Sequence, residues 1–299
     1  IAICPPTFGM YAVCAAVQGA GIVRVPLDDR FALDADAVLE ACTPAVKLLF
    51  LCSPNNPTGG VIARETIEYL AKALADRTLI IVDEAYIEFA DTPGVADLLA
   101  RHSNLAVLRT LSKAWALAGA RIGALLADAG IIDLLRRIMP PYPLPTPSVR
   151  AALEALDEDG ERRMLERVAV IREERERLRE ALRDTQEVRE VLSSQANFLA
   201  VRLDDAQAVY RRLAAQGIVV RDVSRYPGLA NCLRISIGTP VENTRFLTAL
   251  TPSPVGACPA GDSLEAGSGL RPSPAGQAPT GGDSVHAKVR GNVSTREGA

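Results

Sequence analysis

Leu-Ile-Ile-Val-Asp-Glu-Ala-Tyr, residues 79–86, is the stretch of sequence that decides the fold. Its leading apolar residues form a short run, which is typical of a strand buried on both faces of a parallel sheet. Asp83 ends this run, and Tyr86 follows three residues later. A carboxylate in this place either caps the next segment or faces a ligand, because ligands bind at the carboxyl ends of strands in open α/β sheets. The stretch therefore predicts a buried strand that delivers Asp83 and Tyr86 to one edge of a sheet.

Short apolar runs alternate with amphipathic stretches on both sides of this strand. We expect strands at 22–26, 47–52, 78–83, 105–109 and 122–127. Helical spacing of apolar residues occupies the segments between them, at 35–42, 64–75 and 95–101. This alternation predicts an α/β layer fold with a mostly parallel sheet.

The second half of the chain has a different pattern. The proline-rich run 139–147 predicts a stiff extended connector, because proline lacks an N–H donor and fixes φ. Residues 149–183 are strongly helical and charged. A smaller α+β unit follows, with strands expected near 187–192, 197–203, 218–222 and 232–237 and helices near 205–216 and 241–250.

These patterns predict three parts: a large domain over 1–147, an interdomain helix with a small C-terminal domain over 148–250, and a tail over 251–299. The tail is rich in Pro, Gly, Ser and Ala, and has too few large apolar residues to offset the entropy of ordering. We expect it to be disordered, or to arise from a fusion or a frameshift. The chain opens without an initiator methionine or the basic region of a signal peptide, so we expect it to be a fragment that begins inside a domain.

Composition excludes several classes of function. A chain of 299 residues with 48% hydrophobic residues can bury a large core. The net charge of −3 argues against a nucleic-acid or membrane partner, and no apolar run approaches the roughly 20 residues of a membrane span.

Six scattered cysteines without a C-x-x-C pair favour a reducing cytoplasm and no disulfides. Two histidines argue against a His-based metal site or a Ser-His-Asp triad.

Lys113 lies in Leu-Arg-Thr-Leu-Ser-Lys (108–113), before a run of small apolar residues. A desolvated lysine amine can form a Schiff base with an aldehyde cofactor. Thr110 and Ser112 offer hydroxyls, and Arg121 offers a planar guanidinium suited to phosphate oxygens. Alone, this lysine would be read as a surface residue and the arginine as part of a structural ion pair. Together with a strand-end carboxylate and a phenol, they predict a site for pyridoxal 5'-phosphate.

Further groups complete the pattern. Asp83 would keep the pyridine nitrogen protonated, and Tyr86 would reach the phenolate oxygen, unless Tyr86 is only a packed residue with a satisfied hydroxyl. The turn Ser-Pro-Asn-Asn-Pro-Thr-Gly-Gly (53–60) follows a predicted strand and would present Asn56 to the same oxygen. Phe8 would stack on a planar ring, although an aromatic residue in this place is more often part of a core.

Three motifs resemble the fold-type I pyridoxal-phosphate aminotransferases of the class II family. They are Asn-Asn-Pro-Thr-Gly (55–59), Asp-Glu-Ala-Tyr-Ile-Glu-Phe (83–89) and Arg-Thr-Leu-Ser-Lys-Ala-Trp-Ala-Leu-Ala-Gly-Ala-Arg-Ile-Gly (109–123). The resemblance covers about residues 1–250, in order and with matching spacings. It implies the α/β PLP-transferase fold type I, with a mostly parallel sheet in the large domain and a smaller C-terminal α+β domain.

The resemblance also implies roles around the cofactor ring. Lys113 would be the Schiff-base lysine and the proton shuttle, and Asp83 would pair with the pyridine nitrogen. Asn56 and Tyr86 would contact the phenolate oxygen. Phe8 would stack on the ring, where the family usually has tyrosine.

Matching positions further imply how phosphate and substrate are held. Thr110, Ser112 and Arg121 would bind the cofactor phosphate. Arg234, in Cys-Leu-Arg-Ile-Ser-Ile-Gly, would bind the anionic group of the substrate. Tyr142, in the proline-rich connector, is a weaker candidate for the wall of the pocket.

The connector and the Arg234 motif are most similar to the members of histidine biosynthesis that transfer the amino group of L-histidinol phosphate to 2-oxoglutarate. That resemblance implies imidazole acetol phosphate and glutamate as products and a homodimer in the cytoplasm. Related enzymes acting on aromatic amino acids or threonine phosphate share the same site, so they are alternatives. A catalytically incompetent fragment is a third reading, because the family's N-terminal segment has no counterpart here.

Overall fold

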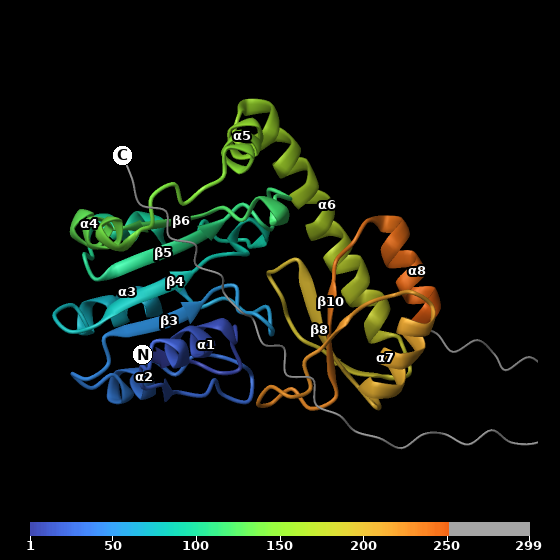
Figure 1. Ribbon diagram of the computed structural model, residues 1–299. Helices are drawn as coiled ribbons and strands as arrows, with labels where there is room; N and C mark the ends of the chain where they lie inside the picture. The colour runs from blue at the N-terminus through green and yellow to red at the C-terminus, as the bar shows by residue number, and fades with distance from the viewer. Residues whose placement is uncertain (251–299) are drawn as a thin grey trace, which may run out of the picture. The chain divides into compact units, whose positions relative to one another are not determined.

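Two sheets organise the part of the chain that the computed structural model describes, residues 1–250 (Figure 1). The larger sheet has six strands in the order β2-β1-β3-β4-β5-β6, and the smaller has four in the order β7-β8-β10-β9. The tail that we expect to be disordered, 251–299, lies outside the described residues. Within residues 1–250, no helix combines the length and the apolar character that crossing a membrane requires.

The larger sheet is parallel except at one edge, where β5 pairs antiparallel with β6. Its strands are β1 (Ala2–Ile3), β2 (Val23–Arg24), β3 (Leu48–Cys52), β4 (Leu79–Asp83), β5 (Leu105–Thr110) and β6 (Gly123–Ala127). This arrangement confirms the predicted fold class. The sequence did not reveal β1, because two residues are too few to show an alternating pattern.

Helices and short 3₁₀ helices connect these strands. They are α1 (Met10–Val17), α2 (Ala35–Ala41), α3 (Arg64–Ala73), η1 (Ile87–Phe89), η2 (Ala96–Ala100), η3 (Ala118–Ala120) and α4 (Ala129–Ile138). The expected helix over 95–101 is only the 3₁₀ helix η2, and the prediction of a full helix was wrong. A segment this short gains too few hydrogen bonds to offset the cost of nucleating an α-helix.

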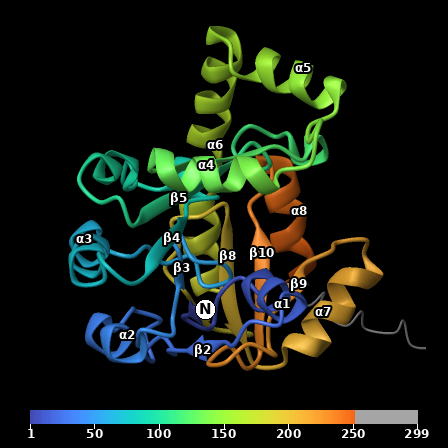
Figure 2. The ribbon, with the colours of Figure 1, turned by 60° about the vertical axis from the view of Figure 1, so that its left-hand side comes forward.

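The two faces of the larger sheet bury different residues, because successive side chains on a strand point to opposite faces. Leu49 and Leu51 of β3 pack with α2 and α3 in the main core. Phe50 and Cys52 of the same strand instead pack with Tyr11 of α1. Figure 2 accordingly shows α2 and α3 on one side of the sheet and α1 on the other. The α1 face is the one on which the candidate site is built.

The smaller sheet is antiparallel and follows two helices. These elements are α5 (Thr146–Ala155), α6 (Glu158–Arg183), β7 (Val188–Val191), β8 (Phe198–Leu203), α7 (Ala206–Ala215), β9 (Arg221–Asp222), β10 (Cys232–Ser236) and α8 (Pro240–Leu250). The chain leaves the helical conformation between α5 and α6, where Asp157 caps α6 by accepting a hydrogen bond from the Gly160 amide. The predicted connector also ends early. Pro147 lies in the first turn of α5, where a missing N–H is tolerated.

Helix α6 joins the two halves of the fold. Met164 and Val168, in its N-terminal half, pack with Tyr86 beside the larger sheet. Leu178 and Leu182, in its C-terminal half, lie in the core of the smaller sheet. One helix therefore places the smaller sheet against the carboxyl edge of the larger one.

Candidate functional site

A cavity of about 520 Å³ lies where the strands of the larger sheet end. Asp83 at the end of β4, Asn56 after β3 and Lys113 after β5 all line it, together with Tyr86. Arg234 reaches the same cavity from β10 of the smaller sheet. Parallel strands end at one edge, so residues far apart in the sequence meet here.

An adjoining cavity of about 390 Å³ contains the second group of predicted residues, Thr110, Ser112 and Arg121. Phe8, Asp83, Ala85 and Lys113 line both cavities, so the two form one continuous site. The structure thus brings together every predicted site residue except one. The exception is Tyr142, which is 96% exposed in the connector and lines neither cavity.

The carboxylate of Asp83 is held on both oxygens. Its Oδ1 accepts a hydrogen bond from the Ala85 amide at 3.1 Å, and its Oδ2 accepts one from the Tyr11 hydroxyl at 2.6 Å. Asp83 does not cap a helix, because η1 begins only at Ile87 and has no side-chain cap. The structure therefore does not show the capping reading of this carboxylate, and it places Asp83 at the wall of the cavity.

Lys113 is an exposed residue on the wall of the cavity, but its amine is partly desolvated there and lies among other cations. Burial lowers the pKa of its amine first, and the positive charges of Arg234 and Arg121 lower it further, while Asp83 opposes them. Its Nζ lies 5.1 Å from the centre of the Tyr86 ring. A lowered pKa gives a larger neutral fraction near neutral pH, which is the form that attacks carbonyl groups.

Tyr86 is a buried phenol that keeps its proton. Burial raises its pKa to about 12, although the charge of Arg234 works against this. The ring packs edge-on against Phe198 of β8, with 5.2 Å between centroids. A protonated phenol at the wall of the cavity can donate a hydrogen bond to a ligand.

Arg234 connects the two sheets. Its Nη1 donates to Asn56 Oδ1 at 2.6 Å, and its guanidinium lies 4.9 Å from the centre of the Phe198 ring. Its buried Nε has no hydrogen-bond partner within the described part of the chain. A buried donor without a partner is costly, so this nitrogen is available for an anionic ligand.

The loop between β5 and β6 is ordered by its own backbone. Thr110 Oγ1 accepts from the Ser112 amide at 3.1 Å and donates to the Ile122 carbonyl at 3.3 Å. Arg121 has a left-handed backbone with φ of 57°, and its Nη1 donates to the Ala118 carbonyl at 2.9 Å. Such a conformation is strained for a residue other than glycine and is often found at functional sites.

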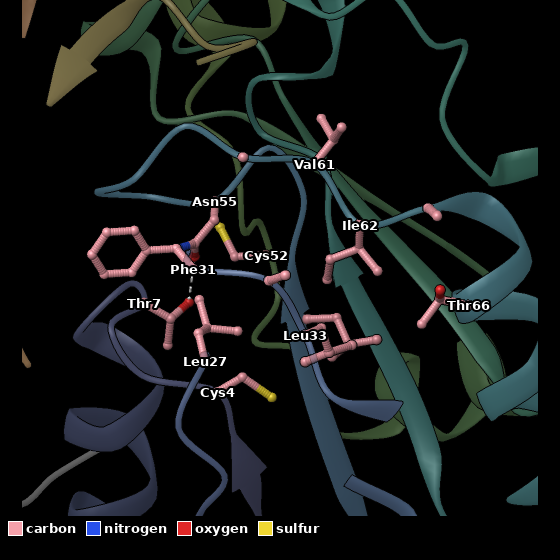
Figure 3. Close-up of a pocket in the computed structure, with 14 residues that line it drawn as sticks. Cys4, Thr7, Leu27, Phe31, Leu33, Cys52, Asn55, Val61, Ile62 and Thr66 are labelled. Atoms are coloured by element: carbon pink, nitrogen blue, oxygen red, sulfur yellow. Dashed lines mark hydrogen bonds between the residues drawn. The ribbon is translucent and has the colours of Figure 1, made fainter. Parts of the chain in front are cut away.

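Hydrogen bonds of the neighbouring residue Asn55 hold the turn that carries Asn56 in place. Asn55 is buried, and its side chain donates to the Pro6 carbonyl and to Thr58 Oγ1 while accepting from Thr7 Oγ1 at 2.9 Å. Figure 3 shows Thr7 and Asn55 at the wall of a third cavity, of about 240 Å³, between apolar side chains. This cavity shares Cys52 with the main one but contains none of the predicted site residues. Its wall contains Thr7 and Asn55, whose hydrogen bond helps to hold the turn in place.

Several residues that line the main cavity were not predicted from the sequence. They are Gly9, Met10, Val13, Cys52, Pro57, Ala85, Arg221, Asp222, Val223 and Tyr226. Arg221 lies directly opposite Arg234 in the pairing of β9 with β10, so a second guanidinium faces the site. The sequence did contain a sign of Arg221, because Arg221 and Asp222 are charged residues at the end of a predicted apolar strand.

Sequence comparisons agree with this geometry. The model of the family described as aminotransferase class I and II matches residues 1–250. A histidinol-phosphate aminotransferase of Stenotrophomonas maltophilia (strain R551-3) is 52% identical over 255 residues, which cover 84% of this chain and 70% of that protein. One from Xanthomonas euvesicatoria pv. vesicatoria (strain 85-10) is 50% identical over 254 residues, with the same coverage.

Solved structures give the same result. The histidinol-phosphate aminotransferase of Clostridium acetobutylicum matches with a TM-score of 0.78 and 27% identity, over 83% of this chain and 76% of that one. The enzyme of the same name from Sinorhizobium meliloti, in complex with pyridoxal-5'-phosphate, matches with a TM-score of 0.76 and 29% identity, over 84% and 68%. The chain belongs to the aminotransferase class I and II family.

Proposed function

We propose that this chain carries the site of a pyridoxal-phosphate-dependent aminotransferase of histidine biosynthesis. The reaction transfers the amino group of L-histidinol phosphate to 2-oxoglutarate and gives imidazole acetol phosphate and glutamate. The observation that carries the proposal is the meeting of Lys113, Asp83 and Arg234 at one cavity. The names of the relatives support the choice of substrate.

The chemistry of the side chains fits pyridoxal 5'-phosphate. The main cavity offers an amine of lowered pKa, a carboxylate and a protonated phenol. The adjoining cavity offers two hydroxyls and a guanidinium, which suit a phosphate group. When bound, the cofactor supplies an electron sink for a carbanion at the substrate α-carbon.

Each side chain has a proposed task toward the cofactor. Lys113 would hold its aldehyde carbon, and Asp83 would pair with its ring nitrogen. Asn56 and Tyr86 donate to its phenolate oxygen, and the Asn56 amide is free for this because Arg234 occupies its oxygen.

The remaining tasks are packing and anion binding. Phe8 would cover one face of the ring. Thr110, Ser112 and Arg121 would bind the phosphate.

Lys113 then acts as the general base. Its Nζ would accept the proton of the substrate α-carbon and deliver it to the aldehyde-derived carbon of the cofactor, so that the amino group stays with the cofactor. The neighbouring Arg234 and Arg121 keep a share of this amine neutral, because a second positive charge nearby disfavours its protonation. A base whose pKa lies closer to the working pH transfers protons more effectively.

Two guanidiniums select an anionic substrate. Arg234 has a buried Nε free for an additional acceptor, and Arg221 faces the same cavity from the adjacent strand. A phosphate oxygen accepts hydrogen bonds from such planar donors, as does the carboxylate of 2-oxoglutarate. Arg234 and Arg221 can therefore bind histidinol phosphate in one half-reaction and 2-oxoglutarate in the other.

We also propose a homodimer, located in the cytoplasm, with a large domain over 1–147 and a small domain over 148–250. Leu134, Ile138 and Met139 are exposed apolar residues on and just after α4, with Ile138 at 78%. Clustered exposed apolar side chains mark an interaction surface. Light scattering of the purified chain tests the dimer, and a monomer at micromolar concentration would contradict it.

Substrate assays test the proposed reaction. The purified protein with pyridoxal phosphate is given histidinol phosphate, phenylalanine or threonine phosphate, each with 2-oxoglutarate. We expect glutamate to form fastest with histidinol phosphate. A higher rate with phenylalanine, or release of carbon dioxide from threonine phosphate, would assign a related activity. A protein that develops no visible cofactor band would be a catalytically incompetent chain.

A further inference from the structure

Tyr11 holds the carboxylate on which the proposed function depends. Its hydroxyl donates to Asp83 Oδ2 at 2.6 Å, while the Ala85 amide donates to Oδ1 at 3.1 Å. A carboxylate can accept about four hydrogen bonds, so each oxygen retains room for another donor. We propose that Tyr11 is a positioning residue, which fixes the plane of the Asp83 carboxylate and keeps it ionised toward the pyridine nitrogen. This inference rests on the proposed function.

Packing fixes the Tyr11 ring. Tyr11 lies in the first turn of α1 and is only 7% exposed. Its ring stacks on Phe50 of β3, with 4.8 Å between centroids and 18° between planes, and meets Phe8 edge-on at 5.6 Å. Phe50 and Asp83 therefore lie on the same side of the sheet as α1. One face of the phenol is stacked and a second ring packs edge-on against it, so the ring is held with its hydroxyl toward Asp83.

The proton stays on Tyr11. Burial raises the pKa of its phenol, and the negative charge of Asp83 raises it further, because a phenolate beside a carboxylate is disfavoured. Tyr11 is thus a neutral donor near neutral pH. The hydrogen bond always runs from the phenol to the carboxylate.

A donor on Oδ2 has two effects on Asp83. It favours the ionised carboxylate over the protonated acid, since hydrogen bonding to the charged form stabilises that form. It also prevents rotation of the carboxylate, which the Ala85 amide alone would not stop. Both effects act on the ring nitrogen of the cofactor through Asp83, without contact between Tyr11 and the substrate.

The test compares two variants that each remove one phenol oxygen. Tyr11→Phe removes the proposed donor. Tyr69→Phe is the control, because Tyr69 is 48% exposed on α3, at the opposite face of the sheet. Each protein is loaded with pyridoxal phosphate labelled with ¹⁵N in the ring, and the ¹⁵N resonance reports whether the ring nitrogen is protonated.

We expect wild type and Tyr69→Phe to show a protonated ring nitrogen. In Tyr11→Phe the resonance should move toward that of neutral pyridine, and turnover should fall roughly tenfold, as when a hydrogen bond to a charged group is lost. A merely structural role for Tyr11 would not move the ¹⁵N resonance of folded protein. An unchanged resonance and rate would overturn the inference.

A second substitution covers the case in which Tyr11→Phe does not fold. Fluorotyrosine at position 11 keeps the ring and the hydroxyl but makes the phenol a stronger donor. The stronger donor draws charge from Asp83 and weakens its bond to the protonated ring nitrogen, so the ¹⁵N resonance should move further toward that of free pyridinium. Circular dichroism should stay unchanged, and an unmoved resonance would again contradict the role. Failure of the proposed function is a different result: the wild-type protein would form no borohydride-reducible cofactor band.

Discussion

Arg234 on β10 donates a hydrogen bond to Asn56 in the loop after β3, with 2.6 Å between Nη1 and Oδ1. The two residues are 178 positions apart in the chain, and their bond joins the smaller sheet to the carboxyl edge of the larger one. It settles the orientation of both side chains at once. The Asn56 amide nitrogen is left to donate into the cavity, and the buried Arg234 Nε is left for an anion.

Arg234→Lys keeps the charge but loses the planar fork, so it tests this geometry. We expect the KM for histidinol phosphate to rise roughly tenfold to hundredfold, since charge-assisted hydrogen bonds are lost. Steady-state kinetics at saturating 2-oxoglutarate measures the change. Arg211→Lys, at an exposed position of α7, is the matched control and should leave the KM as it is. An unaltered KM in Arg234→Lys would remove this residue from the substrate site.

Lys113→Ala should abolish turnover, because the amine that holds the cofactor and moves the proton is gone. The borohydride-reducible absorbance of the bound cofactor should disappear with it. Lys72→Ala, which removes an exposed lysine paired with Glu68 on α3, should keep both. If Lys113→Ala retained activity and absorbance, another residue would have to carry the chemistry.

The lowered pKa of Lys113 predicts a pH dependence of cofactor capture. Only the neutral amine attacks an aldehyde, so the rate at which the apo-protein captures pyridoxal phosphate should rise with pH and level off above the pKa of Lys113. Because burial and two arginines lower this pKa, the rise should come at a lower pH than for an ordinary lysine. Stopped-flow absorbance follows the reaction.

The variant Arg234→Gln tests whether Arg234 contributes to the lowered pKa of Lys113. Loss of its positive charge removes one cause of the lowered pKa, so the midpoint should move to higher pH. A midpoint that stayed in place, or moved down, would show that Arg234 does not act on the amine.

Asp83→Asn should lose most activity and retain part of the cofactor. The amide matches the carboxylate in shape but has no charge with which to keep a ring nitrogen protonated. Turnover and the dissociation constant of the cofactor, measured on the same preparation, separate the two effects. Rates near those of wild type would count against pairing of Asp83 with the ring nitrogen.

The sequence revealed those parts of the fold and site that are encoded locally. The apolar run before Asp83 predicts a buried strand, and strand ends in a parallel sheet share an edge, so Asp83, Asn56 and Lys113 could be placed together in advance. The short β1 and α1 were missed, since neither shows a clear periodicity. The role of Tyr11 was missed with α1, because its partner Asp83 is 72 positions away.

Long-range packing accounts for the other differences. Arg221 reaches the site, and Phe198 reaches the Tyr86 ring, only through the register of the smaller sheet, and register depends on contacts that no short window contains. Tyr142 had a suggestive motif, yet the connector holds it in solvent. Composition and spacing identify chemical groups, but they do not give the direction in which a side chain on an irregular segment points.

Because helix α6 is long, a small tilt at one of its ends produces a large displacement at the other. Its 26 residues span roughly 39 Å at the usual rise per residue, with the wall of the site at one end and the core of the smaller sheet at the other. A tilt of about 5° at the first end would displace the other by roughly 3 Å, which exceeds the length of the Arg234–Asn56 hydrogen bond. The position of Arg234 opposite Asn56 therefore depends on the angle of one helix axis.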